Sequence, residues 1–258
     1  MIDLKDKLNK RELTIGSWIT FGDLAVAEIM ARAGFDWLTV DMEHSAITLY
    51  QAQHLIQVIE LCGVTPLVRV EENNHNYIKR VMDAGAHGVI VPMVNTGIEA
   101  KKAVDAVKYP TSGKRGFGLA RAQRYSLDLE AYRKWNQEKS IVIVQIEHIR
   151  AVENLETIMA VEGVDGFMIG PYDLSGSLGC PGDFDHPAFR KTLDEIYRKS
   201  KANGYLMGQH VVKPGPRGVL DAIDMGFRFI AFGVDFLFLG ESCRNLLGEV
   251  KGKLKESI

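Results

Sequence analysis

One pattern recurs along the chain: an amphipathic helical stretch, then a glycine, then two or three residues, then a short apolar run. It is clearest in EIMARAGFDWLTV, IKRVMDAGAHGVIVP, ENLETIMAVEGVDGFMIG and GVLDAIDMGFRFIAFG. The glycine suits the left-handed position that ends many helices, and the apolar run that follows predicts a strand. Each repeat is therefore the second half of a β-α-β unit.

The same pattern, followed from end to end, predicts eight strands, each with a helical stretch after it. They span residues 16–20, 37–41, 66–70, 88–94, 141–147, 166–170, 205–210 and 229–233. Near-continuous apolar strands that alternate with helices are typical of a parallel sheet buried on both faces. Eight such units predict an α/β fold, a closed (β/α)8 (TIM) barrel formed by residues 1–258 as a single domain. A doubly wound open sheet is the alternative, but it usually has fewer strands.

Composition and charge limit the classes of molecule that the protein is expected to bind. The chain has 258 residues, of which 46% are apolar and 25% charged, as in a soluble globular protein. Its 31 Lys and Arg against 33 Asp and Glu give a net charge of -2, so no overall basic field attracts nucleic acid or anionic lipid. The longest apolar runs are too short to span a membrane. We therefore expect small-molecule partners, with neither nucleic acid nor membrane among them.

The ends and the cysteines bear on the cellular location. The first residues, MIDLKDKLNKRELT, are charged throughout and lack the apolar stretch of a secretory signal. Cys62, Cys180 and Cys243 have no metal-ligand spacing and cannot all pair, which fits a reducing compartment. We expect a cytoplasmic protein.

The predicted fold locates the chemistry, because active sites of such barrels lie at the carboxyl ends of the strands. Gln145 and Glu147 are two residues apart and share one face of their strand. Asp173 follows the next strand, and two neighbouring carboxylates repel unless a proton or a cation lies between them. A divalent cation such as Mg²⁺ or Mn²⁺, which prefers oxygen ligands, meets that need. Spacing alone leaves a pair of solvated loop carboxylates as an equal alternative.

Four further polar residues lie at the ends of predicted strands. Arg69 carries a permanent charge that can stabilise an oxyanion, although it can equally serve to neutralise an acidic mouth. His44 follows Asp41 by three positions, so a turn can bring the carboxylate onto the imidazole and produce a general base. Capping and surface roles are the alternative for this pair. Glu43, between them, is either an outer-shell acid or a solvated one.

Two glycine-rich segments remain. Residues 112–118 do not follow a strand as a phosphate loop would, so we expect a mobile loop over the barrel mouth from which Arg115 or Arg121 reaches inward. Residues 170–182, GPYDLSGSLGCPG, lie where substrate would bind, and their backbone amides can hold a carboxylate. No lysine ends a predicted strand, which argues against a Schiff-base mechanism.

Taken in order, several motifs together resemble those of the HpcH/HpaI family of metal-dependent (class II) pyruvate aldolases. They are VDMEH, the VRV strand, IKRVMDAGAHGVIVPMV, YP..GKRGFG, QIE..RAVENLE and GPYDLSGSLG…DHP, and the resemblance runs over residues 16–239. Members include 4-hydroxy-2-oxoheptanedioate aldolase and 2-dehydro-3-deoxyglucarate aldolase. The resemblance implies a (β/α)8 barrel whose C-terminal helix is swapped onto a neighbouring subunit, in a homohexamer built as a trimer of dimers.

The resemblance also implies roles for individual residues. Glu147 and Asp173 match the ligands of a divalent metal, which would be Mg²⁺, Mn²⁺ or Co²⁺. His44 matches the catalytic histidine with Asp41 as its partner, and Arg69 matches the arginine that stabilises the pyruvate enolate.

Substrate contacts follow from the same resemblance. Gln145 matches a glutamine near the keto acid, and the amides of Tyr172 and Asp173 match those that hold its carboxylate. Asp83 is similar to an acid that some members contribute to a neighbouring subunit's pocket. The sequence departs from the family at Glu71-Glu72, His148 and Tyr172, and the first and last of these leave the preferred aldehyde open.

The function that these inferences favour is that of a carbon–carbon lyase, which reversibly cleaves a 4-hydroxy-2-oxo acid to pyruvate and an aldehyde. Two alternatives use the same residues differently. One is related enolate chemistry, such as oxaloacetate decarboxylation or a citrate-synthase-like or macrophomate-synthase-like condensation. The other is a barrel that binds keto acids without catalysis, against which the retained metal carboxylates and the Asp41 and His44 pair weigh.

Overall fold

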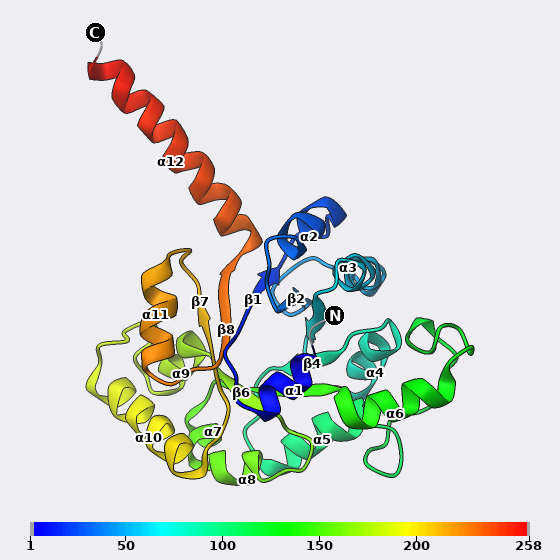
Figure 1. Cartoon of the computed structure of the whole chain (residues 1–258). Coiled ribbons are helices and arrows are strands. Elements are labelled where there is room, and N and C mark those ends of the chain that lie inside the picture. The colour runs from blue at the N-terminus through cyan, green and yellow to red at the C-terminus, as the bar shows by residue number, and fades with distance from the viewer. Residues whose placement is uncertain (1–2, 257–258) are drawn as a thin grey trace.

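Eight parallel strands close into a barrel in the computed structural model, which describes residues 3–256 (Figure 1). Each strand pairs with its neighbours in the sequence, and β1 also pairs with β8. The strands are β1 (Thr14–Ile19), β2 (Trp37–Asp41), β3 (Thr65–Arg69), β4 (Gly88–Val91), β5 (Ile141–Ile146), β6 (Gly166–Ile169), β7 (Met207–Val211) and β8 (Phe229–Val234). The predicted closed barrel is confirmed, and the doubly wound alternative is excluded.

Helices connect the strands around the outside of the barrel (Figure 1). They are α1 (Leu4–Asn9), α2 (Leu24–Ala31), α3 (Leu49–Leu61), α4 (His75–Asp83), α5 (Gly97–Val107), the 3₁₀ turn η1 (Arg121–Gln123), α6 (Leu129–Lys139), α7 (Ile149–Glu153), α8 (Leu155–Met159), α9 (Pro171–Ser177), α10 (Pro187–Asn203), α11 (Pro216–Asp224) and α12 (Asp235–Glu256). The glycines after α2 and α4, Gly34 and Gly85, have φ of 98° and 104°. This is the left-handed ending that the repeat predicts.

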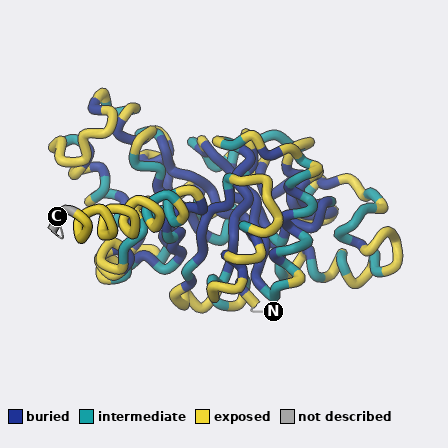
Figure 2. The backbone as a smooth tube through the Cα atoms, turned by 90° about the horizontal axis from the view of Figure 1, so that it is seen from above, coloured by how far each residue is buried: buried dark blue, intermediate teal, exposed yellow. Residues whose placement is uncertain are grey.

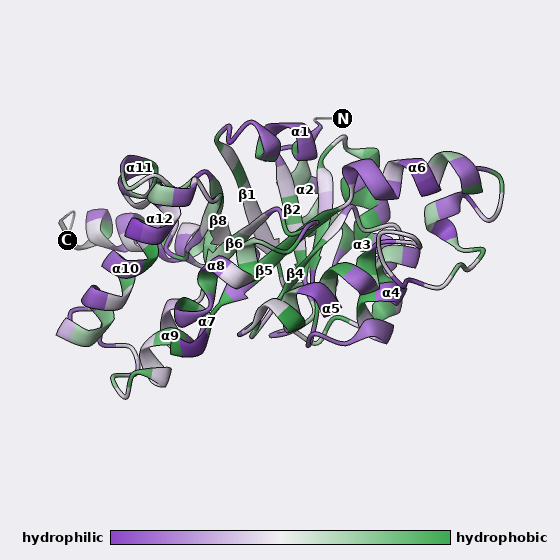
Figure 3. Cartoon of the chain, turned by 90° about the horizontal axis from the view of Figure 1, so that it is seen from below, coloured by the Kyte–Doolittle hydropathy of each residue, from purple (hydrophilic) through white to green (hydrophobic). Residues whose placement is uncertain are grey.

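The core forms two layers. Buried aliphatic side chains fill the space between the strands and the helices, and a second cluster fills the inside of the barrel. In this inner cluster Trp37 stacks on Phe229 with the ring centroids 4.1 Å apart. A side chain at Gly16 would overlap the Trp37 ring, so this glycine makes room for the stack. Figure 2 shows the buried strands at the centre, and Figure 3 shows their apolar character beside the more polar helices. The packed interior leaves the strand ends as the place for polar chemistry.

Several strands end earlier or later than the pattern predicts. β4 ends at Val91 rather than at residue 94, because Pro92 has no amide to donate and Met93 has a φ of 53°. β5 ends at Ile146, so Glu147 lies just beyond the strand. β7 begins at Met207 rather than at residue 205. The shifts of β4 and β5 place residues 92–94 and Glu147 on the loops at the carboxyl end of the barrel, whereas the shift of β7 lies at the opposite end.

The C-terminal helix α12 leaves the barrel as a projecting arm (Figures 1 and 2). Its first turn is anchored, because Phe238 contacts Phe35 and Phe232. Beyond that turn, apolar side chains are exposed on the helix: Leu239, Leu246, Leu247, Val250 and Leu254. In the single chain, the helix thus exposes a row of apolar side chains to solvent.

Candidate active site at the carboxyl end of the barrel

Asp41 and Arg69 form a two-pronged ion pair at the carboxyl end of the barrel, which is called the mouth below. They lie opposite each other at the ends of β2 and β3. Arg69 donates from Nε to Asp41 Oδ1 over 2.9 Å and from Nη2 to Asp41 Oδ2 over 2.6 Å. The guanidinium also lies over the Trp18 ring, 4.4 Å from its centroid. A two-pronged ion pair with an aromatic ring beneath it fixes the position and plane of the arginine.

The expected contact between the Asp41 carboxylate and the His44 imidazole is not formed. Asp41 Oδ1 instead accepts from the backbone amides of Glu43 and His44, at 3.1 and 3.2 Å. The imidazole is 66% exposed, and its Nε2 lies 3.8 Å from Glu43 Oε2. The physical reason is the register, which presents Arg69 to both oxygens of Asp41 before the chain turns. Asp41 thus holds the backbone of His44 rather than its ring.

Glu147 is held by two donors just past β5. Gln145 Nε2 donates to its Oε1 over 2.9 Å, and the Met93 backbone amide donates to its Oε2 over 3.0 Å. The prediction that Gln145 and Glu147 share one face is confirmed. A side chain at Gly170, after β6, would overlap the Glu147 carboxylate. The glycine therefore makes room for the acid.

At the mouth, the surroundings of two glutamates disfavour the charged form of each. Burial raises the pKa of Glu147 to about 7, and the carboxylates of Glu43 and Asp173 add to the rise. Burial likewise raises the pKa of Glu43 to about 7; Arg69 opposes the rise, while Asp41 and Asp173 add to it. Four acids are thus electrostatically coupled around one arginine. The coupling fits the sequence expectation that these strand-end carboxylates come together.

Asp173 lies in the first turn of α9, directly after β6. The N-cap position of this helix is Gly170, which has no side chain to accept from the first-turn amides. Tyr172 is 66% exposed and packs edge-on against Phe184, with the ring centroids 5.0 Å apart. The turn therefore presents a carboxylate and backbone amides at the mouth, and the tyrosine ring is held by Phe184.

The donor set at the mouth fits a divalent cation. Buried carboxylates that repel one another are relieved by a bound cation, and Gln145 Oε1 is buried without a hydrogen-bond donor. Within residues 3–256 no group of three or more His, Cys, Asp or Glu side chains is arranged to hold an ion. A site with few protein ligands is the arrangement in which hard cations keep positions open for substrate.

Two further residues lie at the mouth, Trp18 and His210, and the sequence assigned neither of them a chemical role. His210 on β7 donates from Nε2 to Gly233 O over 2.9 Å, and its ring lies 5.5 Å from that of Trp18. Burial lowers the pKa of His210 to about 4, so the ring is neutral at pH 7. Trp18 and His210 together form the wall behind Arg69. The signal in the sequence that could have identified these two residues is an aromatic or imidazole side chain on the inward face of a strand.

Asp83 and the glycine-rich loop lie outside this mouth within one chain. Asp83 accepts from Arg115 Nη2 over 2.6 Å, and Arg115, fully buried, also donates to the Tyr132 hydroxyl over 3.1 Å. Arg121 pairs with Glu60 and donates to a backbone carbonyl on the outer surface. The expectation that Arg115 or Arg121 reaches into the chain's own mouth is wrong, because both guanidinium groups are already paired elsewhere.

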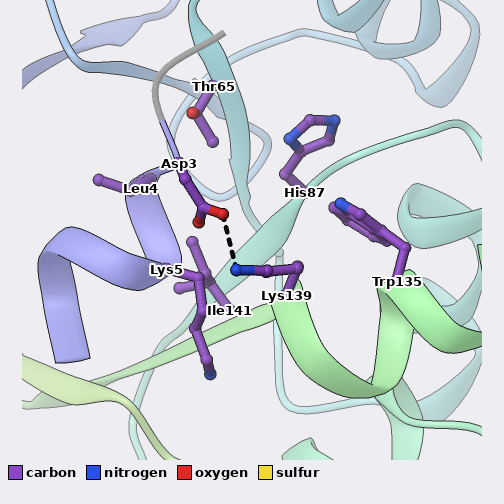
Figure 4. Close-up of a pocket in the computed structure, with 8 residues that line it drawn as sticks. All are labelled: Asp3, Leu4, Lys5, Thr65, His87, Trp135, Lys139 and Ile141. Atoms are coloured by element: carbon purple, nitrogen blue, oxygen red, sulfur yellow. Dashed lines mark ion pairs between the residues drawn. The ribbon is translucent and has the colours of Figure 1, made fainter.

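The opposite end of the barrel holds a pocket of about 220 Å³ (Figure 4). It is lined in part by Thr65 and Ile141, the first residues of β3 and β5, and is crossed by an ion pair of 2.7 Å between Asp3 and Lys139. Conserved chemistry in barrels of this kind lies at the other end, so this pocket belongs to the stabilising face.

None of the helices between residues 3 and 256 has the length and apolarity to cross a bilayer.

A closed parallel barrel whose ionisable side chains gather at the carboxyl ends of its strands is the architecture of a barrel enzyme. Residues 14–241 match the HpcH/HpaI aldolase/citrate lyase family, and the chain belongs to that family. The 2-keto-3-deoxy-L-rhamnonate aldolase of Escherichia coli strain K12 is 35% identical over 96% of this chain and 92% of its own length. The family resemblance found in the sequence is thereby confirmed.

Solved structures agree with this assignment. An HpcH/HpaI aldolase/citrate lyase family protein from Burkholderia cenocepacia J2315 superimposes with a TM-score of 0.91 at 30% identity, over 97% of this chain and 100% of its own. A citrate synthase, SbnG, superimposes with a TM-score of 0.83 at 26% identity, over 98% of each chain. The fold is thus shared by relatives with two different named reactions.

Proposed function

We propose that the protein is a carbon–carbon lyase that reversibly cleaves a 4-hydroxy-2-oxo acid to pyruvate and an aldehyde. The observation that supports this best is the cluster of strand-end carboxylates around Arg69, in a chain that belongs to an aldolase family. The named activity of the Escherichia coli relative is of this reaction class. The alignment with this relative covers 92% of the relative's length and spans the whole barrel of this chain.

Glu147 and Asp173 are the proposed ligands of a divalent cation, Mg²⁺, Mn²⁺ or Co²⁺. When bound, such a cation acts as a Lewis acid that withdraws electron density from the keto group of the substrate. Gln145 faces the same position as Glu147, with its buried Oε1 still without a donor. The amides of Tyr172 and Asp173 are proposed to bind the substrate carboxylate, because the helix start there has no capping side chain.

Arg69 and His44 are the proposed catalytic pair. Cleavage leaves negative charge on the oxygen of the pyruvate enolate, and a guanidinium fixed by Asp41 stabilises that charge without reorganising. His44 is exposed at the mouth, where its ring can take the proton of the C4 hydroxyl group as the bond to C3 breaks. Glu43 Oε2 lies 3.8 Å from His44 Nε2 and 3.2 Å from Arg69 Nη1, so Glu43 is proposed to link the two residues in place of the Asp41–His44 contact.

The assembly is part of the proposal. The exposed apolar side of α12 supports the expectation that this helix is swapped onto a neighbouring subunit in a homohexamer. Asp83, whose side chain is 21% exposed while it pairs with Arg115 over 2.6 Å, is proposed to reach a neighbour's pocket. Three cysteines without disulfides, Cys62, Cys180 and Cys243, support the expected cytoplasmic location.

A second reaction has a specific observation behind it. The match to a citrate synthase over 98% of this chain favours condensation of an enolate with a keto acid as the alternative use of the same residues. The discriminating experiment incubates the enzyme with pyruvate or oxaloacetate, a panel of aldehydes and keto acids, and Mg²⁺, Mn²⁺ or Co²⁺, and identifies products by mass. We expect 4-hydroxy-2-oxo acids from pyruvate and aldehydes; citrate-like products alone would replace the aldolase proposal with the condensing one.

A further inference from the structure

Met93 holds an unusual backbone conformation beside the active site. Its φ is 53°, in the left-handed region that residues other than glycine rarely adopt. Its amide donates to Glu147 Oε2 over 3.0 Å. Strain of this kind persists only where the surroundings enforce it, and it gathers at functional sites. The hydrogen bonds around Met93 therefore identify what keeps this residue in the left-handed conformation.

Asn95 holds the carbonyl end of the same residue. Its Nδ2 donates to Met93 O over 3.1 Å, two residues back along the chain. Its own backbone amide donates to Glu99 Oε2 over 2.6 Å. One asparagine thus links the strained peptide to the first turn of α5.

That turn is itself fixed from two sides. Thr96 caps α5 by accepting from the Glu99 amide over 3.2 Å. Asn154, between α7 and α8, donates to Asn95 O over 3.0 Å. A Cβ at Gly97 would come within 2.8 Å of the Thr157 carbonyl oxygen, so α5 and α8 are packed closely here. Residues 93–99 therefore rest on a rigid support.

We propose that Asn95 is a positioning residue, which holds Met93 left-handed so that the Met93 amide fixes the second oxygen of Glu147. Gln145 fixes the first oxygen, and together the two donors set the plane of the carboxylate. The predicted effect on metal affinity rests on the proposed function, because it needs Glu147 to be a metal ligand. The predicted effect on the conformation of the Met93 loop does not depend on the proposed function.

The backbone geometry supplies a test by rescue. Asn95→Ala removes the bond to Met93 O, so Met93 is expected to relax and Mn²⁺ affinity to fall roughly tenfold, as is common when a partner of a metal ligand is lost. Met93→Val should have the same effect, because a β-branched residue disfavours positive φ. Met93→Gly, which tolerates this φ without strain, should restore most of the affinity in the Asn95→Ala background.

Tyr125→Gly is the matched control. Tyr125 also has a φ of 53°, and its side chain is 64% exposed on the outer surface near η1. The change relieves equal strain at a distance, so it should neither alter Mn²⁺ affinity nor rescue Asn95→Ala. Equal rescue by Tyr125→Gly would overturn the proposal, since it would reveal a general gain in stability.

Two readouts separate this inference from the proposed function. Titration calorimetry measures Mn²⁺ affinity, and hydrogen exchange of the peptide 91–97 without metal measures the loop itself. Asn95→Ala should speed that exchange roughly three- to tenfold, the range for one lost hydrogen bond. A wild-type protein that binds no Mn²⁺ contradicts the proposed function alone, and the exchange then decides the inference. Unchanged exchange in Asn95→Ala, or unchanged Mn²⁺ affinity where the wild type binds, overturns it.

Discussion

At the scale of single residues, the site is set by which donor reaches each carboxylate. The two-residue spacing of Gln145 and Glu147 was sufficient to predict that they share one face, where they hydrogen-bond, because side-chain direction in a strand alternates regularly. The partner of Asp41 was not predictable in the same way. Both Arg69 and His44 are within its reach, and only the register of β2 against β3 decides for Arg69. Local spacing predicts contacts within one strand better than contacts after a turn.

Glu43 provides a prediction at this scale. Its pKa is about 7 in the folded chain against an ordinary value of 4.5. Between these values the folded protein holds a proton that the unfolded chain releases, so the free energy of unfolding falls as pH rises from 4.5 to 7. Glu43→Gln removes this loss, and the metal-free variant should be more stable than wild type at pH 8 by up to about 3 kcal/mol.

Urea unfolding at pH 4 and pH 8 measures the effect. At pH 4 both proteins carry an uncharged group at this position, so their midpoints should nearly coincide. The exposed Glu72→Gln serves as the control and should show no such dependence on pH. If the difference in urea midpoint between Glu43→Gln and wild type is no larger at pH 8 than at pH 4, the buried charge is compensated in another way.

At the scale of elements, the repeat predicted all eight strands, and their ends depended on local backbone chemistry. Pro92 and Met93 stop β4 three residues early, because neither can continue the ladder in its observed conformation. No sequence rule predicts a methionine at positive φ, since its cause is a network of side chains from α5 and from the turn before α8. Strand existence follows from periodicity, whereas strand ends follow from tertiary contacts.

The exposed stripe on α12 provides the prediction for an element. Leu239, Cys243, Leu246, Val250 and Leu254 recur at helical spacing, and each is exposed in the single chain. If α12 packs on a neighbour, Leu246→Glu with Val250→Glu should convert the wild-type assembly to smaller species in sedimentation. The thiol of Cys243 should then react faster with an alkylating reagent.

Asn245→Glu is the matched control, because Asn245 is exposed on the same helix but off the stripe. This variant should keep the wild-type assembly. Wild-type protein that sediments as a 28.7 kDa monomer would refute the swapped helix, since a single chain would then leave the stripe in water.

At the scale of the whole molecule, the fold class and the family were predictable because both rest on ordered patterns of many residues. The eightfold repeat predicted the closed barrel, and the series of motifs predicted the HpcH/HpaI family; both are confirmed. Which mouth residues hold a cation and which move protons stays a proposal. Those roles depend on a substrate that meets Arg69, His44 and Glu147 together.

The central claim is that this mouth stabilises the enolate of pyruvate with a cation held by Glu147. The most direct measurement is exchange of the pyruvate methyl protons in deuterated water with Mg²⁺ or Mn²⁺, followed by NMR without any aldehyde. We predict metal-dependent exchange in wild type, and loss of at least about two orders of magnitude in Glu147→Gln at unchanged folding, as expected when a metal ligand is removed. Wild-type protein that exchanges no protons with any of these metals, or Glu147→Gln that exchanges them at the wild-type rate, would contradict the account.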